Sequence, residues 1–440
     1  MSFHHPYSVH LPRYVVWMLC LVWTASGFAE EPLSLAAAQR AAIERSRQLA
    51  SQDAAASAAK EMSVAARQLP DPMLRAGIDN LPVTGPDQFS LTQDFMTMRR
   101  IGIAQEFTRG DKRDARATRF ERESEKVLAE RQASIAEIQR QTAAAWLERY
   151  YAERFSSVLQ EQIGAAQSET KAVEAVYRGG RGSQADVIAS HAAVVELEDR
   201  HAELGQRIAR AKAALARWVG ELAQAPLAAP PSFDLSAVNT EQLGHELSQH
   251  PTILALKKQQ EMAIAEANLA RANQHADWTV ELTYSQRGPA YSNMISFSVS
   301  IPLQWDQKNR QNRELAAKLA QVNEVEAQQE EALRAHIAEV QAMLVDREAT
   351  QARHSRYQKE LLPLARERAR ASLAAYSGGK ATASELIAAR RAELEVKLQA
   401  LQLESQAAQV WAQLNFLLPH ANGFEDQVGA AHADGGRIPR

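Results

Sequence analysis

The sequence predicts a mainly α-helical fold with a membrane β-barrel part, in which a helix–β-hairpin–helix unit occurs twice. Two observations carry this prediction. Long Ala-, Gln-, Glu- and Arg-rich segments have the apolar spacing of long, coiled-coil-like helices, and four short segments alternate apolar with polar residues as strands do. The low aromatic content and the few glycines and prolines argue against a β-sandwich or a propeller.

An internal duplication sets the architecture, and such repeats are the first pattern to look for. Two segments match in register: Tyr177-Arg-Gly-Gly-Arg-Gly-Ser-Gln-Ala-Asp186-Val-Ile-Ala and Tyr376-Ser-Gly-Gly-Lys-Ala-Thr-Ala-Ser-Glu385-Leu-Ile-Ala. The Tyr, the Gly pair, a basic residue, an acid and Ile-Ala coincide. We therefore expect a first repeat over 30–225, a linker over 226–239 and a second repeat over 240–418.

Each repeat is predicted to run helix, two strands, long helix, turn, helix. The expected helices are 34–69, 112–176 and 184–222, followed by 240–274, 309–376 and 383–417. The expected strands are 73–80, 96–107, 278–286 and 292–303. At 1.5 Å per residue, helix 112–176 would be about 98 Å long, far beyond a globular helix. Two shorter helices stacked end to end would roughly match it, so a wall of long and stacked helices is expected.

The first 29 residues read as a signal peptide. Arg13 precedes an apolar run over 14–23, and small residues at Gly27 and Ala29 predict cleavage after Ala29. Lipidation at Cys20, the single cysteine, and an uncleaved membrane anchor are the two alternatives. The last segment, 419–440, is expected to be a disordered tail.

The strands point to a membrane. In segment 295–303 the apolar residues alternate with serines, and segment 278–285 follows the same pattern. The small and polar face would line a water-filled lumen through Thr279, Glu281, Thr283, Ser296, Ser298 and Ser300. Each run has about the length of a tilted transmembrane strand. The alternative is a small soluble sheet that packs one face on a helix.

Four strands are too few for a closed barrel, because small barrels need about eight. An open strand edge is not tolerated in lipid, where each unpaired backbone group lacks a partner. If these strands lie in a membrane, several copies of the chain must therefore share one barrel.

With these features the chain resembles the TolC-like outer-membrane efflux family over about residues 31–418. The segment Asp71-Pro-Met-Leu-Arg-Ala-Gly-Ile-Asp-Asn-Leu-Pro, with Met96-Thr-Met and Gln105-Glu-Phe, is similar to the cation-efflux (Czc/Cus) branch. The resemblance implies a homotrimer with a 12-stranded barrel in the lipid of the outer membrane of a Gram-negative bacterium. It also implies a long periplasmic α-helical tunnel, a periplasmic adaptor protein and an inner-membrane RND-type transporter that supplies energy.

The resemblance also assigns the two matching turns to the periplasmic tip, where the adaptor docks. The tip residues would be Tyr177, Gly179, Gly180, Arg181, Tyr376, Gly378, Gly379 and Lys380. Glycine can take a positive φ, which lets helices reverse tightly. Asp186 and Glu385 are expected to constrict the mouth and to pair with Arg181 and Lys380 between helices. Family members can carry a second acid three residues later, where this chain has Ala189 and Ala388, so its constricting ring would be thinner.

The expected function is a passive exit duct of a tripartite efflux pump, with heavy-metal cations as cargo. Drugs or other small molecules are the alternative cargo, and a periplasmic coiled-coil structural or adaptor protein is the alternative class. No metal site, cofactor or enzyme activity is expected, because histidines such as His191 and His201 lack ligand spacing and no nucleophile–base arrangement stands out. A net charge of −3 gives no reason to expect nucleic acid binding.

Overall fold

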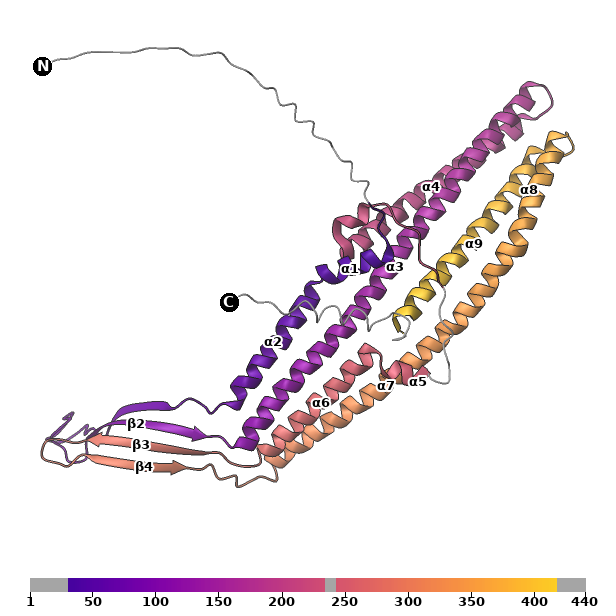
Figure 1. Cartoon of the computed structure of the whole chain (residues 1–440). Helices are drawn as coiled ribbons and strands as arrows, with labels where there is room; N and C mark the ends of the chain where they lie inside the picture. Colours follow the sequence, from indigo (N-terminus) through magenta and orange to yellow (C-terminus); the bar gives the residue numbers. More distant parts are fainter. Residues whose placement is uncertain (1–30, 234–242, 418–440) are drawn as a thin grey trace, which may run out of the picture.

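The computed structural model describes residues 31–233 and 243–417. The chain forms an elongated rod, with a four-stranded sheet at one end and two helical hairpins at the other (Figure 1). The expected signal peptide and C-terminal tail lie outside the described residues, as does the part of the expected linker from residue 234 onward.

The first repeat contains two short helices, a strand pair and a long helical hairpin. Its elements are α1 (Leu35–Arg45), α2 (Arg47–Arg67), β1 (Met73–Asp79), β2 (Met98–Phe107), α3 (Gly110–Arg178), α4 (Gln184–Val219) and the short 3₁₀ helix η1 (Gly220–Gln224). The second repeat follows the same order. Its elements are α5 (Leu243–Ser248), α6 (Pro251–Ala272), β3 (Trp278–Gln286), β4 (Met294–Ser300), α7 (Gln311–Arg356), the π-helical turn η2 (Tyr357–Leu361), α8 (Leu362–Ser377) and α9 (Ala383–Leu417).

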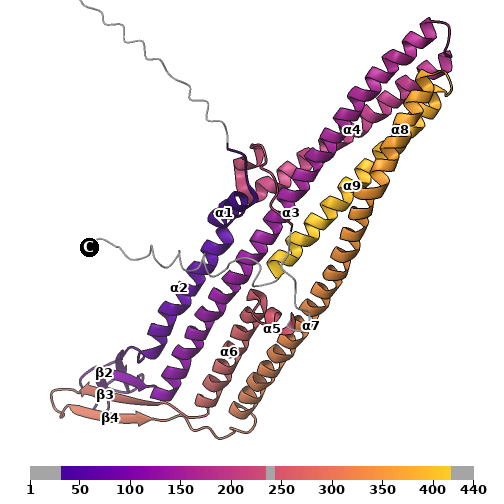
Figure 2. The ribbon, with the colours of Figure 1, turned by 45° about the vertical axis from the view of Figure 1, so that its right-hand side comes forward.

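Helix α3 is the longest helix of the described residues and packs against helices of both repeats. Its 69 residues give it a length of about 104 Å at 1.5 Å per residue. It contacts α2 and α6 toward the sheet and α4 and α9 toward the far end. Figure 2 shows α1 and α2 following α4 along the rod, with α6 and α9 beside α7 and α8. The predicted wall of long and stacked helices, and with it the fold class, is confirmed.

Two helices predicted as unbroken are interrupted near their starts. In 34–69, Ser46 has an extended backbone and its Oγ accepts from the N–H of Leu49, so it caps α2 and ends α1. In 240–274, Pro251 drives the preceding His250 into an extended backbone and begins α6. The prediction of unbroken helices is wrong at both places, because a capping side chain or a proline can end a helix although the apolar pattern continues.

Two further helix ends differ from the expectation. Helix 309–376 continues past Pro363 by way of the π turn, in which the N–H of Leu362 donates to the carbonyl of Tyr357. This turn accommodates a proline that would otherwise clash with the preceding carbonyl. Helix 184–222 ends instead at Val219, because Gly220 takes a φ of 66°.

The main core lies at mid-length, where α1, α3, α4 and α9 meet. Trp146 is fully buried and its indole N–H donates to the carbonyl of Leu33 at 3.0 Å. The guanidinium of Arg149 is 2% exposed and donates to the carbonyls of Ala223 and Ala225. These contacts join the first described residues and the end of η1 to the middle of α3.

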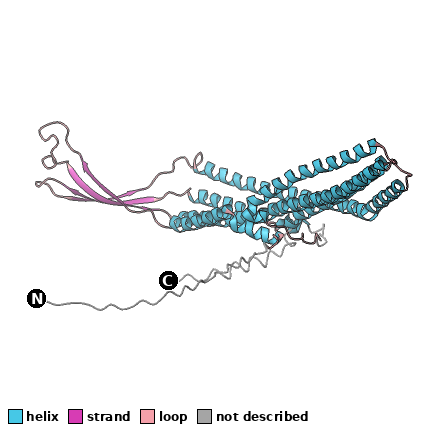
Figure 3. Ribbon diagram, turned by 90° about the horizontal axis from the view of Figure 1, so that it is seen from above, coloured by secondary structure: helices cyan, strands magenta, loops and turns pink. Residues whose placement is uncertain are grey.

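Figure 3 shows the strands at one end of the molecule, beyond the helices. The four strands form one antiparallel sheet in the order β1-β2-β3-β4. The strand pair of each repeat is therefore joined to the other by β2 and β3. Two strands are shorter than predicted: an Asp94 carboxylate that accepts from the N–H of Met96 and Thr97 delays β2, and β4 ends before Pro302. Among residues 31–233 and 243–417, no helix has both the length and the apolar character to cross a bilayer.

Candidate functional site

The six residues predicted to line a lumen share one face of the sheet. Directly paired residues of antiparallel strands point to the same side. The pairs are Thr279 with Ser300, Glu281 with Ser298, and Thr283 with Ser296. The structure thus brings all six together, and their role in lining a lumen remains a prediction.

This polar face also carries charges, which are paired across strands. Arg75 Nη1 lies 2.7 Å from Glu281 Oε2, and Arg100 Nη1 lies 3.2 Å from Asp79 Oδ2. The hydroxyl of Thr283 donates to the other oxygen of Glu281 at 3.1 Å. Glu281 is therefore not a free acidic group on this face, and the two arginines offset the two acids.

The polar face is tightest at Gly102, which pairs with Thr283 where the two repeats join. A Cβ atom on Gly102 would lie 2.6 Å from Thr283 Oγ1 and 2.9 Å from the carbonyl oxygen of Leu282. Only glycine fits this approach of β2 to β3 without moving the backbone.

The opposite face of the sheet is apolar and exposed. Ile103, Leu282 and Phe297 occupy successive strands in one row, and Ile101, Tyr284 and Ile295 occupy the next row. These side chains are 42 to 75% exposed. At the end nearest the helices, Phe107 stacks on Trp278 with ring centroids 4.6 Å apart. A patch of this kind marks a surface that something else covers.

At the far end of the rod, both hairpin turns have the same backbone geometry. Gly180 and Gly379 take φ of 74° and 70°. The N–H groups of Arg181 and Lys380 donate to the carbonyls of Val176 and Ala375, five residues earlier, which is the Schellman motif. Gly179 and Gly378 are the C-caps and keep negative φ, so only one glycine of each pair needs the freedom expected of both.

The two predicted gate acids are helix caps in this structure. Asp186 accepts from the Ser183 N–H and Oγ, and its own N–H donates to Ser183 Oγ. Glu385 and Thr382 form the equivalent reciprocal pair. Within the described residues no ion pair joins either acid to Arg181 or Lys380, and the gate role of the two acids stays a prediction. A carboxylate three residues after a capping Ser or Thr turns back to its own helix start.

The two hairpin tips nevertheless lie close together. The pKa of Tyr376 is raised, first by burial and then by the charge of Asp186. Because Tyr376 belongs to the second hairpin and Asp186 to the first, the two turns share one electrostatic environment. Tyr177 of the first turn is exposed.

Ion pairs that the sequence did not indicate join the two hairpins below the tips. Arg390 lies 2.7 Å from Glu169, and Arg200 lies 2.7 Å from Glu395. Two more pairs connect α9 with α4 and α3: Arg391 with Glu196, and Lys397 with Glu161. A cavity of about 50 Å³ lies among them. These partners are far apart in sequence, and no spacing pattern predicts such pairs.

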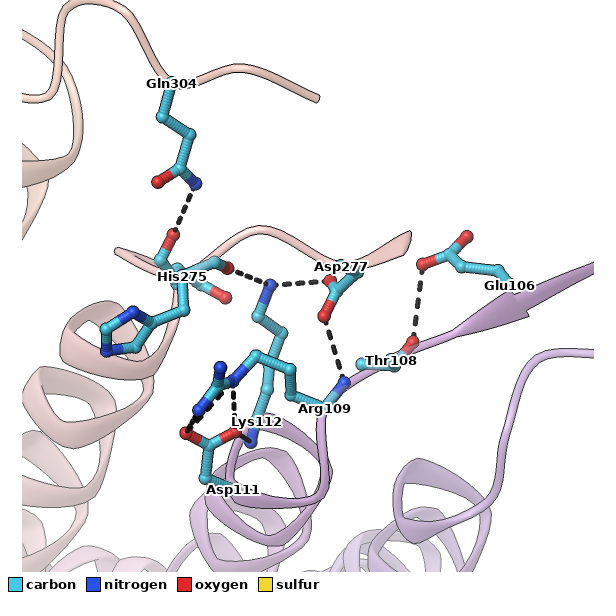
Figure 4. A network of polar contacts seen from close by, with 9 residues as sticks. Glu106, Thr108, Arg109, Asp111, Lys112, His275, Asp277 and Gln304 are labelled. Carbon is cyan, nitrogen blue, oxygen red and sulfur yellow. Dashed lines mark hydrogen bonds and ion pairs between the residues drawn. The ribbon is translucent and has the colours of Figure 1, made fainter. Parts of the chain in front are cut away.

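The sheet meets the helices at a second polar cluster, shown in Figure 4. Lys112 Nζ lies 2.6 Å from Asp277 Oδ2 and donates to the His275 carbonyl at 3.1 Å. The N–H of Arg109 donates to the other oxygen of Asp277 at 3.0 Å, while its guanidinium pairs with Asp111. Burial raises the pKa of Asp277, but the hydrogen bonds from Lys112 and Arg109 outweigh it, so that pKa lies below its usual range.

The structure brings together two histidines that sequence spacing kept apart. The rings of His250 and His336 lie 5.3 Å apart, and His250 Nε2 lies 3.3 Å from the Phe416 carbonyl. Burial, followed by the charge of His336, lowers the pKa of His250. His191 faces Glu174 instead of His201. Among the described residues, no group of three or more His, Cys, Asp or Glu is arranged to hold a metal ion.

Residues 243–420 match the model of a family described as outer membrane efflux protein. This match covers the second repeat and shows that this part of the chain is similar to that family. None of the curated proteins compared with the chain matches it.

Solved structures share their fold with nearly the whole length of the chain. It is similar to the outer membrane protein VceC of Vibrio cholerae, with 20% identity, a TM-score of 0.71 and coverage of 87% of this chain and 95% of that one. CusC is 15% identical, with a TM-score of 0.71 and coverage of 88% of this chain and 92% of that one. The CmeC outer membrane channel of Campylobacter jejuni is 10% identical, with a TM-score of 0.73 and coverage of 90% of this chain and 88% of that one.

These comparisons establish the fold of TolC-like channels for this chain. They do not separate the branches of the family, because CusC resembles this chain no more than VceC or CmeC does. The cation-efflux assignment therefore stays a prediction.

Proposed function

We propose that three copies of this chain form a passive exit duct in the outer membrane, through which a tripartite pump exports its cargo. The observation that carries the proposal is the sheet: one face is apolar and exposed, the other is polar, and β1 and β4 are edge strands. A sheet of this kind fits lipid outside and water inside.

The number of strands sets the number of copies. A four-stranded sheet leaves the backbone groups of its two edges without partners, which lipid does not tolerate. If β4 of one copy pairs with β1 of the next, three copies close a 12-stranded barrel, above the roughly eight strands that a small barrel needs. The helices of the three copies then continue the barrel as a periplasmic tunnel.

The hairpin tips are the proposed docking point for a periplasmic adaptor, linked to an inner-membrane RND-type transporter that supplies the energy. The Gly180 and Gly379 turns carry no side chain at the point of reversal, so another backbone can approach. The ion pairs between the hairpins, such as Arg390 with Glu169, are partly exposed and worth only about 0–1 kcal/mol each. Weak pairs of this kind suit a closed tip that must open and close.

Heavy-metal cations are the proposed cargo, on the resemblance of the segment from Asp71 onward to the cation-efflux branch. One observation favours drugs or other small molecules instead. On the polar face of the sheet, Glu281 and Asp79 are each paired with an arginine, which weakens the attraction of these two carboxylates for a cation. Deleting the gene and measuring growth on metal salts and on drugs separates the two, because only the true cargo should become more toxic.

The native mass of the protein extracted from outer membranes in detergent tests the duct. We expect a trimer, because only a closed barrel satisfies the edges of β1 and β4. A monomer that is released without detergent would contradict the proposal, and the sheet would then be a soluble one.

Valine at the two turn glycines should impair efflux. A β-branched residue at the positive φ of Gly180 or Gly379 costs about 1–2 kcal/mol, which should distort each Schellman turn and weaken adaptor binding. We expect the double variant to lose most efflux resistance while it still assembles in the membrane, as measured by growth on the cargo and by co-purification of the adaptor. Gly164→Val, in the middle of α3, is the matched control. Unchanged efflux and adaptor binding would rule out the tip assignment.

A further inference from the structure

One arginine of the sheet, Arg99, lies on the apolar face and has no polar partner there among the residues that the structure describes. Arg75 and Arg100 lie on the polar face, and each pairs with a carboxylate. Arg99 lies on the other face, since it is paired with Ile78 on one side and Gln286 on the other, in step with Ile101 and Ile103. Within the described residues Arg99 makes no ion pair or hydrogen bond, and its Nε is buried without a partner.

The position of Arg99 along the strand is specific. It stands at the loop end of the apolar face, and the stacked pair Phe107 and Trp278 stands at the helix end. Eight residues separate Arg99 from Phe107, which is about 27 Å along a strand and about 21 Å along a barrel axis at a usual tilt. Membrane barrels have an apolar band about 25 Å tall. Arg99 is therefore at the outer edge of that band, on the side away from the periplasmic helices.

A second cation lies at the same edge. Arg287 follows Gln286, the register partner of Arg99. Its guanidinium stacks over Tyr291 with the Cζ atom 4.9 Å from the ring centroid and donates to the Phe95 carbonyl, and its Nε has no partner. No carboxylate among the described residues pairs with either arginine. In contrast, Gln105, also on the apolar face, is satisfied by the carbonyls of Pro70 and Glu106.

From this placement we propose that Arg99 binds the phosphate of a lipid headgroup in the outer leaflet. A guanidinium that faces lipid at the level of the headgroups needs an anion, and its fork of donors matches a phosphate. The site rests on the proposed membrane insertion of the sheet. It would fix the height of the barrel in the membrane through a bound lipid.

The test uses the full-length protein in detergent and counts bound lipid by native mass spectrometry. The probes are short-chain phosphatidic acid, the matching diacylglycerol and inorganic phosphate. We expect phosphatidic acid to bind about five-fold more tightly than diacylglycerol, as one basic residue near an anionic headgroup provides. Arg99→Gln should abolish this preference. Arg100→Gln, the neighbouring residue on the polar face, should keep it.

Two results would overturn the proposal: an unchanged preference in Arg99→Gln, or inorganic phosphate that displaces the lipid at equal concentration. If Arg99→Gln does not fold, the wild-type protein is treated with phenylglyoxal, which modifies guanidinium groups. Phosphatidic acid but not diacylglycerol should protect Arg99, and an unprotected Arg99 refutes the site. A trimer without lipid preference refutes this inference alone, whereas a monomer that binds neither lipid refutes the duct itself.

Discussion

Lys112→Met is expected to destabilise the protein by about 1–3 kcal/mol, because it leaves a largely enclosed carboxylate without its ion-pair partner. The Lys112 and Asp277 side chains are only 7% and 15% exposed. They join the start of α3 to the start of β3, and so join the first repeat to the second where helices become sheet. Chemical unfolding of the detergent-extracted protein measures the effect.

The exposed neighbour provides the control. Arg109 and Asp111 also form an ion pair, but their side chains are 46% and 48% exposed, so Asp111→Asn should cost at most about 1 kcal/mol. The double variant Lys112→Met with Asp277→Leu should recover much of the loss, because it leaves no unpaired buried charge. If the single and double variants are equally unstable, the ion pair is not the source of the stability.

The pH dependence follows from the lowered pKa of Asp277. A carboxyl with a folded-state pKa below 3.8 contributes stability that is present above pH 3.8 and is lost as the pH falls through the lower value. In Lys112→Met, burial without the Lys112 hydrogen bond should raise that pKa. The difference between wild type and variant should therefore be largest at neutral pH and should shrink below about pH 4.

The elements that long periodic patterns define could be predicted from the sequence. The helices around 112–176 and 383–417 and the strand 278–286 lie where expected, because burial of one face repeats over many residues. The breaks within the helices were not predicted, because a single residue determines where each helix ends. Ser46 and Pro251 each end a helix inside an unchanged apolar pattern, and the π turn before Pro363 leaves no periodic trace.

In the candidate site too, features with a repeating pattern could be predicted, whereas contacts between distant residues could not. Alternation alone predicted which strand residues share the polar face, and the matched turns predicted two hairpins of equal geometry. The sequence also contains the capping boxes at Ser183 and Thr382, where an acid follows three residues later, and the gate role of these acids stays a prediction. The contacts of Lys112 with Asp277 and of Arg390 with Glu169 depend on tertiary packing, so no local pattern carries them.

Gly102→Val is expected to abolish trimer assembly. The valine Cβ would overlap Thr283 Oγ1 and the carbonyl oxygen of Leu282, so the backbones of β2 and β3 would have to separate. Overpacking of this kind costs about 1–3 kcal/mol or more, and it falls on the one strand pair that joins the two repeats in the sheet. A barrel of three copies contains this contact three times, so the free-energy cost per trimer should be about three times the cost per chain. The measurement is the yield of trimer in outer-membrane extracts.

Gly77→Val distinguishes a steric effect from a loss of glycine in a strand. Gly77 lies on the same polar face of β1, but a Cβ there would be 3.7 Å from Arg100 Nε, an ordinary contact, so this variant should assemble. Thr283→Ala should not rescue Gly102→Val, because the carbonyl oxygen of Leu282 belongs to the backbone and remains 2.9 Å from the new Cβ. A trimer yield from Gly102→Val equal to that of Gly77→Val would show that the β2–β3 contact can open, and that the barrel does not depend on this register.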